Sequence, residues 1–211
     1  ERIFKLLDDK TIIENADNPT RLSIVRGEIE FKNVWFAYNP EDYVLRNVSF
    51  RINPGETIAI VGATGAGKTS IINILTRFYD IAKGSITLDG VDIRNLDIRD
   101  LRKYISIVLQ DVFLFSGTIR SNINLGNEKI TDEQIIEASK TVGAHKFISQ
   151  LPNGYNEVVK EKGATLSVGQ KQLISFARAL AYNPQILILD EATSSVDTET
   201  EQLIQNAIEK L

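Results

Sequence analysis

Cysteine and methionine are both absent from this sequence of 211 residues. The absence of cysteine excludes disulfides, thiolate metal sites and cysteine nucleophiles, and it fits a reducing cytosol. Because methionine is missing even at position 1, we expect the sequence to begin inside a longer polypeptide. The composition therefore points away from a secreted, disulfide-rich domain and from thiol chemistry.

Long apolar runs and an excess of basic charge are missing as well. No run approaches the roughly 20 apolar residues that cross a bilayer, and no signal-peptide pattern opens the sequence. The formal net charge of -4 gives no sign of a nucleic-acid partner, because such proteins usually carry a basic patch. A hydrophobic fraction of 43% suits one globular domain, or a core with a helical lobe.

Strands alternate with helices along most of the sequence, which favours a largely parallel α/β core. Asp89-Gly90 after a strand is typical of a hairpin. Thr131 and Gln134 form a capping box that opens a helical insertion. The expected strands cover residues 28–36 (with a bulge), 48–52, 57–61, 85–88, 105–109 and 186–189. One helix is expected after residue 68, with Ile71, Ile72, Leu75 and Phe78 on one face. Further helices are expected over much of 131–148, over 167–181 and at the end of the chain.

A glycine-rich loop stands between the apolar segment 57–61 and an amphipathic helix. It fits the pattern G-x-x-x-x-G-K-[ST], whose backbone amides and helix N-terminus bind phosphate. Lys68 is expected to contact the β- and γ-phosphates, and Thr69 to offer its hydroxyl to Mg²⁺. The alternative is an ordinary strand-to-helix turn. The candidate nucleotide-binding residues are Gly62, Ala63, Thr64, Gly65, Ala66, Gly67, Lys68, Thr69 and Ser70.

Two acids follow the apolar strand at 186–189. Because ligands of open α/β sheets bind at the carboxyl ends of strands, Asp190 and Glu191 are expected to face the phosphate loop. Asp190 suits Mg²⁺ coordination, and Glu191 suits general-base work on the water that attacks the γ-phosphate. The structural alternative is that the pair only caps the next helix.

A second glycine-containing helix start precedes these acids. Ser167 and Gln170 are spaced as a capping box. The segment Leu166-Ser167-Val168-Gly169-Gln170 also resembles the LSGGQ signature of ABC ATPases. The two interpretations are compatible, since a capped helix start is also a good anion site.

The resemblance to ABC ATPases covers nearly the whole chain and implies roles for three further residues. Tyr38 stands where the family places an aromatic that stacks on adenine, although Trp35 and Tyr43 are rivals. Gln110 resembles the Q-loop glutamine that contacts Mg²⁺ and the attacking water; the alternative is a surface glutamine. Asp197 resembles the D-loop aspartate that touches the opposite subunit, although it or Thr198 also suits a helix cap.

The family also implies the organisation of the chain: a P-loop core with a mainly parallel sheet, an antiparallel β subdomain and an inserted helical lobe. We expect a linker from a membrane domain over 1–20, the ATP-binding core over 21–110 and 182–211, and the helical subdomain over 111–181. The implied function is ATP-driven export, with Mg²⁺, at the cytoplasmic face of a membrane. The implied partners are a second nucleotide-binding domain and a transmembrane domain fused N-terminally.

Three departures from the family pattern stand out. Val168 replaces a signature glycine. Residues 157–163 lack the first acid and the internal glycine of the exporter pattern T-E-V-G-E-R-G. The family's switch histidine is absent: His145 lies on the wrong side of Glu191 and is expected on a helix surface, and the sequence stops at Leu211 before that histidine.

The altered signature beside a retained Glu191 resembles one half of a heterodimeric exporter. One competent site would use this chain's Lys68, Asp190 and Glu191, and one degenerate site would use its Ser167 and Val168, together with Gly169 and Gln170. Rival classes are an importer ATPase, a non-transport ABC ATPase and a regulatory nucleotide-binding module. The non-transport enzymes need a long coiled coil or zinc cysteines that this sequence lacks, and Glu191 disfavours a regulatory module.

Overall fold

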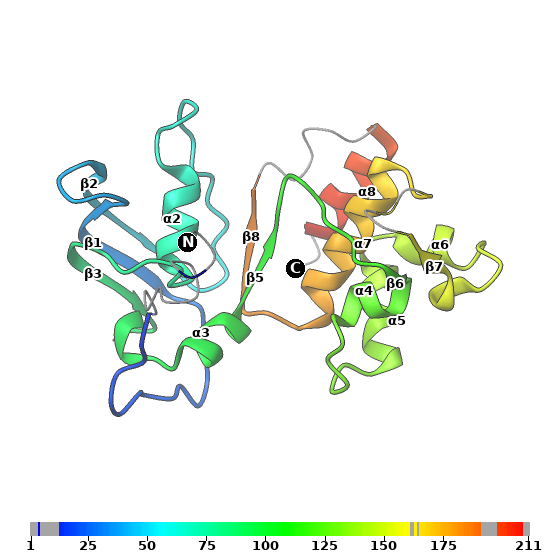
Figure 1. Cartoon of the computed structure of the whole chain (residues 1–211), viewed down its shortest axis with the longest axis horizontal. Coiled ribbons are helices and arrows are strands. Elements are labelled where there is room, and N and C mark those ends of the chain that lie inside the picture. Colours follow the sequence, from blue (N-terminus) through cyan, green and yellow to red (C-terminus); the bar gives the residue numbers. More distant parts are fainter. Residues whose placement is uncertain (1–3, 5–12, 161–162, 164, 191–197, 209–211) are drawn as a thin grey trace. The chain divides into compact units, whose positions relative to one another are not determined.

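The computed structural model of the chain describes residues 4, 13–160, 163, 165–190 and 198–208. Contacts divide the chain into two compact units, Glu1–Tyr104 and Ile105–Leu211. Figure 1 labels the helices and strands of each. Most of the first half of the linker expected over 1–20 falls outside the described residues.

The first unit contains a four-stranded antiparallel sheet in the order β2-β1-β3-β4 (Figure 1). Its central strand β1 has alternating buried side chains, and a register shift against β2 between Phe31 and Val34. The bulged strand predicted there is therefore confirmed. The strands are β1 (Ile29–Ala37), β2 (Tyr43–Ile52), β3 (Lys83–Leu88) and β4 (Val91–Asp92).

The β3–β4 hairpin turns at Asp89 and Gly90, as the sequence predicts. Their φ angles are 49° and 79°, the left-handed values that a two-residue hairpin turn requires. The Asp89 carboxylate accepts hydrogen bonds from the backbone N–H groups of Arg26, at 2.7 Å, and Glu28, at 2.8 Å. The turn thereby fixes the start of β1.

The segment 57–61 differs from its prediction as a strand, because it joins no ladder among the described residues. A strand needs a hydrogen-bonded neighbour. The parallel strands of the described structure, β5 (Ile105–Val108) and β8 (Ile186–Leu189), pair with each other in the second unit. Val61 is 90% exposed.

Helix α2 (Lys68–Leu75) starts where the sequence predicts, but its buried face is different. Ile74 and Leu75 are buried, whereas Phe78 lies beyond the helix end and is 52% exposed. Its ring lies 4.6 Å from the guanidinium of Arg102, a cation–π contact. The helix is one turn shorter than the apolar spacing suggested.

Arg77 follows the C-cap of α2 with a φ of 50°, a left-handed conformation that usually belongs to glycine. Its side chain is 3% exposed and forms five hydrogen bonds at 3.1–3.4 Å. The acceptors are the backbone oxygens of Glu14, Ile93 and Arg94 and the carboxylate of Asp80. These bonds explain why a non-glycine residue occupies a strained position.

The segment expected as a linker is attached to the first unit over its described part, 13–20. The Asn15 side chain accepts from the backbone N–H of Ile98 at 2.8 Å and donates to Asp97 at 3.1 Å. The backbone N–H of Thr20 donates to Asn95 at 2.7 Å. Together with Arg77, these bonds connect the incoming chain to α3 (Ile98–Tyr104) and to the end of α2.

The second unit contains the parallel pair β5–β8 and a group of helices packed on α7. The capping boxes predicted at Thr131–Gln134 and Ser167–Gln170 are both formed. The remaining elements are η1 (Ile93–Asn95) in the first unit and, in the second, α4 (Ile119–Asn124), α5 (Asp132–Thr141), α6 (Ala144–Ile148), α7 (Val168–Ala181), α8 (Thr198–Ile208), η2 (Gly154–Asn156), and the paired short strands β6 (Gly117–Thr118) and β7 (Val158–Val159).

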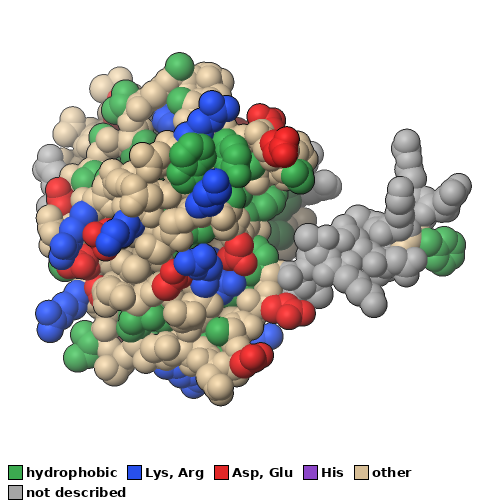
Figure 2. All heavy atoms as spheres, turned by 90° about the vertical axis from the view of Figure 1, so that its left-hand side faces the viewer, with side chains coloured by type: hydrophobic (Ala, Val, Ile, Leu, Met, Phe, Trp, Pro, Cys, Tyr) green, Lys and Arg blue, Asp and Glu red, His purple; other side chains and the backbone are tan. Residues whose placement is uncertain are grey.

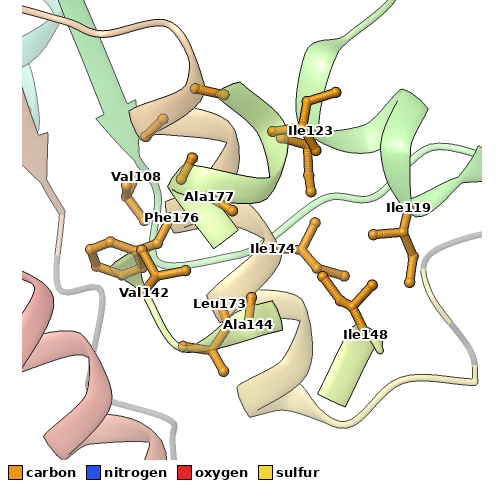
Figure 3. Packing of buried hydrophobic residues seen from close by; sticks show 14 of the residues in the cluster. Val108, Ile119, Ile123, Val142, Ala144, Ile148, Leu173, Ile174, Phe176 and Ala177 are labelled. Atoms are coloured by element: carbon orange, nitrogen blue, oxygen red, sulfur yellow. The ribbon is translucent and has the colours of Figure 1, made fainter. Parts of the chain in front are cut away.

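Helix α7 supplies the centre of the core of the second unit. Ile174, Phe176 and Ala177 are fully buried, and in Figure 3 their side chains lie among residues of α4 and α6 and beside Val142, the C-cap of α5. His145, predicted on a helix surface, is partly buried, and its Nδ1 lies 3.0 Å from the Tyr155 hydroxyl. Burial raises the pKa of that hydroxyl.

None of the helices in the described part of the chain combines the length and apolarity that a bilayer crossing requires. On the face that Figure 2 shows, basic and acidic side chains are interspersed rather than gathered by sign. This agrees with the weak net charge of the sequence.

We expect Arg77→Ala to lower the free energy of unfolding by about 2–4 kcal/mol, because it leaves buried carbonyl oxygens unpaired and keeps the left-handed strain. Arg77→Gly removes the same bonds but relieves the strain, so it should be about 1 kcal/mol less destabilising than Arg77→Ala. Denaturant unfolding of the three proteins measures both differences. A loss below about 1 kcal/mol in Arg77→Ala would contradict this account of the residue.

Candidate nucleotide-binding site

The loop between residue 61 and α2 turns on two left-handed glycines. Gly65 has a φ of 82°, and Gly67, the N-cap of α2, has a φ of 91°. Between them, the backbone N–H of Ala66 donates to the oxygen of Ala63 at 3.0 Å. Left-handed residues alternating with ordinary ones turn successive amides toward one side, which is the geometry of an anion-binding nest.

Gly67 is also required by close packing against β2. A Cβ atom at this position would lie 2.8 Å from Leu45 Cδ2 and 3.2 Å from Val44 Cγ1. Real Cβ atoms essentially never come as close as 2.8 Å, so with a side chain here either the buried Leu45 side chain or the loop would have to shift. The antiparallel sheet therefore fixes the place at which α2 begins.

The Lys68 side chain folds back across this loop. Its ammonium donates to the backbone oxygens of Gly62, at 2.7 Å, and Ala63, at 3.2 Å. The positive charge lies at the N-terminus of α2, where the helix dipole also favours an anion. Thr69, the next residue, is exposed. The Lys68 ammonium thus closes the loop on itself through these two hydrogen bonds, and its positive charge lies where a phosphate would bind.

Tyr38 lies against the first turns of α2. Its hydroxyl is 3.1 Å from Ser70 Oγ and accepts a hydrogen bond from Asn73 Nδ2 at 3.1 Å. The rings of Phe36 and Tyr79 meet it edge to face, at centroid distances of 4.7 Å and 5.0 Å. Tyr38 remains 44% exposed, so part of the ring is open to a base.

The two rival aromatics have different partners. Trp35 and Tyr43 pack edge to face at 5.3 Å, and the Lys83 ammonium lies 5.5 Å from the Trp35 ring. Tyr38, by contrast, is hydrogen-bonded to two residues of α2. The geometry favours Tyr38 as the base-stacking aromatic.

The second unit carries the other site residues. Val108 pairs with Leu189, and the backbone N–H of Asp190 donates to the Val108 oxygen at 2.9 Å. Gln110 and Asp190 therefore follow the carboxyl ends of neighbouring parallel strands, as the sequence predicts. Both carry oxygen atoms, which are the ligands that Mg²⁺ prefers.

The signature segment opens α7 through its capping box. Ser167 Oγ accepts from the Gln170 N–H at 3.1 Å, and Gln170 Oε1 accepts from the Ser167 N–H at 3.0 Å. Val168 is the first helical residue and is 56% exposed, whereas Gly169 is buried. The exposed valine side chain is thus accommodated at the start of α7.

Glu191 and Asp197 lie outside the described residues. The phosphate loop and Tyr38 belong to the first unit, whereas Gln110, Asp190 and the signature belong to the second. The structure thus groups the predicted residues into two sets.

Two polar side chains that the sequence did not single out, the partly buried Arg178 and the buried Asn122, anchor the segment after Gln110. Arg178 on α7 donates to the oxygens of Asn122, at 2.7 Å, and Phe113, at 3.2 Å. Asn122 in turn exchanges hydrogen bonds of 2.8 Å and 2.9 Å with the backbone of Phe115. Burial lowers the pKa of the Arg178 guanidinium. No motif spacing points to either residue, because only the packed helices bring them together.

The family model described as "ABC transporter" matches residues 45–194, which is most of the chain and includes the phosphate loop, Gln110, Asp190 and the signature segment. The chain belongs to the ABC transporter family. Members of this family have the P-loop ATPase fold. The chain is therefore an ABC-type ATP-binding and ATP-hydrolysing domain.

Relatives of this ABC domain are longer proteins. The uncharacterized ABC transporter ATP-binding protein YknV of Bacillus subtilis is 51% identical over 100% of the chain and 35% of its own length. The probable multidrug resistance ATP-binding/permease protein YheH of the same organism is 51% identical over 99% of the chain and 31% of its length. The chain thus spans about a third of these relatives.

Among solved structures, this ABC domain resembles a bacterial Atm1-family ABC exporter with ATP bound. The TM-score is 0.91 at 38% sequence identity, covering 100% of this chain and 37% of that one.

We expect Gly67→Ala to weaken MgATP binding at least tenfold, because the added methyl meets Leu45 and shifts the start of α2. Gly55→Ala is the matched control: Gly55 has a φ of 74°, but a Cβ there has no atom within 4 Å. The control should lose about 1 kcal/mol of stability and keep its affinity. Equal affinities in the two variants, measured by calorimetry, would show that close packing at Gly67 does not shape the site.

Proposed function

We propose that this chain binds and hydrolyses MgATP at the loop 62–69 and serves as the motor domain of a membrane exporter. The observation that carries the proposal is the closed phosphate loop, in which the Lys68 ammonium contacts the oxygens of Gly62 and Ala63 at the start of α2. A positive charge, turned amides and a helix N-terminus converge there, and this is what a triphosphate requires.

Each site residue then has a distinct role. The Lys68 ammonium exchanges its loop oxygens for the β- and γ-phosphates of ATP. Thr69, Gln110 and Asp190 offer the oxygen ligands for Mg²⁺. When bound, Mg²⁺ would neutralise the negative charge of the phosphates. Glu191 orients the attacking water and accepts its proton. Tyr38 stacks on the adenine.

A second nucleotide-binding domain completes each site in this proposal. Two domains pair head to tail, so that the helix start at Ser167, Val168, Gly169 and Gln170 faces the ATP bound to the partner domain. The capped N-terminus of α7 supports this, because its free amides and dipole favour an anion. Asp197 contacts the partner domain.

The names of the relatives support export as the direction of transport. YheH and the Multidrug resistance protein pgp-1 of Caenorhabditis elegans, which is 46% identical over 99% of the chain and 16% of its own length, are named for multidrug resistance, and the matching structure is an exporter. We propose that the chain works at the cytoplasmic face of a membrane, fused at its N-terminal side to a transmembrane domain. Substrate choice then belongs to that domain.

We further propose that the partner domain is a different chain, with an intact signature and an altered counterpart of Glu191. Val168 stands where the signature has glycine, and its exposed, β-branched side chain would crowd a phosphate approaching α7. The start of α7 contributes to the ATP site of the partner domain, so Val168 affects that site. Lys68, Asp190 and Glu191 keep this chain's own site intact.

We expect Glu191→Gln in the full-length protein to reduce steady-state ATP hydrolysis by on the order of 10²-fold or more, because it removes the general base. MgATP affinity should change little, since the residue contributes to the chemical step rather than to binding. Glu201→Gln, at an exposed position on α8, is the control and should preserve the rate. Retention of most of the rate in Glu191→Gln would remove this residue from its role.

We expect Val168→Gly to change the ATPase rate of the complex with the natural partner by less than about twofold, because the competent site takes its signature from the partner. The same variant should raise the rate of an artificial homodimer, in which valine faces both sites. A wild-type homodimer as active as the complex would rule out the asymmetric arrangement, and Val168 would then be a tolerated variation.

A further inference from the structure

Tyr38 is held at both ends of its ring axis. At the backbone end it follows Ala37, the last residue of β1, which pairs with Tyr43 on β2. At the other end its hydroxyl lies between Ser70 and Asn73 of α2. A ring fixed at both ends can only rotate about its own axis, and the edge contacts with Phe36 and Tyr79 oppose that rotation.

The hydrogen bonds at the hydroxyl are chemically complementary. Asn73 Nδ2 donates to the Tyr38 oxygen, which leaves the hydroxyl proton free to be donated to Ser70 Oγ. Ser70 is 5% exposed and follows Thr69 directly, so the bond reaches into the first turn of the helix that ends the phosphate loop. Stacking on a base needs no hydroxyl, since phenylalanine has the same aromatic face.

We propose that Asn73 and Ser70 are positioning residues for nucleobase binding. They hold Tyr38 in the orientation that receives a purine and tie this orientation to the helix that follows the phosphate loop. The inference rests on the proposed ATP binding and adds to it the reason for a tyrosine at position 38. An aromatic held in place before binding loses less freedom when the base arrives, which increases affinity for the base.

A purely structural role for the same hydrogen bonds makes a different prediction. If the bonds only stabilised α2 and its loop, their loss would weaken every ligand that contacts the loop. If they position the aromatic, their loss would weaken only ligands that carry a base. Magnesium tripolyphosphate, which has the phosphates but no base, separates the two.

The experiment measures the Kd of MgATP and of magnesium tripolyphosphate for the 211-residue chain and for Tyr38→Phe, Asn73→Ala and the double variant. Asn73→Ala removes one hydrogen bond to the Tyr38 hydroxyl and should weaken MgATP binding about three- to tenfold, whereas Tyr38→Phe removes both bonds and should weaken it at least as much. Both single variants should bind tripolyphosphate as the wild type does. The double variant should be no weaker than the weaker single variant, because both changes remove one shared interaction. Tyr104→Phe is the control: it removes a hydroxyl at the end of α3 that donates to the backbone oxygen of Leu22 at 3.3 Å.

Two results would overturn the inference. If the variants lost affinity for MgATP and for tripolyphosphate equally, the hydrogen bonds of the Tyr38 hydroxyl would serve only to stabilise the loop. If both single variants kept the wild-type affinity for MgATP, these bonds would have no role in binding the base. A wild-type chain that binds neither ligand would instead contradict the proposed function itself.

Discussion

The contact between the Lys68 ammonium and the oxygens of Gly62 and Ala63 is the interaction on which the candidate site depends. It holds a positive charge inside the curve of the loop. The curve exists because Gly65 and Gly67 take left-handed φ values. Gly67 in turn has no room for a side chain against Leu45, so the sheet of the first unit determines where the loop ends and α2 begins.

Helix α2 is attached at both ends, and each attachment links it to a functional feature. At its start, Ser70 and Asn73 hold the aromatic that we assign to the base. At its end, Arg77 joins the helix to the incoming segment at Glu14 and to the hairpin region at Ile93. Arg102 adds bonds of 3.0 Å and 2.8 Å to the oxygens of Thr76 and Arg77. Hydrogen bonds therefore hold the short helix α2 near both of its ends.

Features governed by local rules could be predicted from the sequence. The capping boxes at Thr131 and Ser167 and the turn at Asp89 depend on residues within three positions of one another, and all three were confirmed. Arg77, Asn73 and Arg178 could not be identified, because their partners lie far away in sequence and only the folded chain brings them together. The strand expected at 57–61 was not found, because apolar composition does not specify a hydrogen-bonded neighbour. Tyr38 was one of three candidates until its bonds to α2 favoured it.

Hydrogen exchange with and without saturating MgATP tests the central claim, that ATP occupies the loop closed by Lys68. The account predicts that MgATP slows exchange of the backbone amides of residues 62–70, which turn toward the phosphates, and leaves the β3–β4 hairpin unchanged. The same pattern should not occur with magnesium alone. Bound MgATP without protection of residues 62–70 would contradict the account.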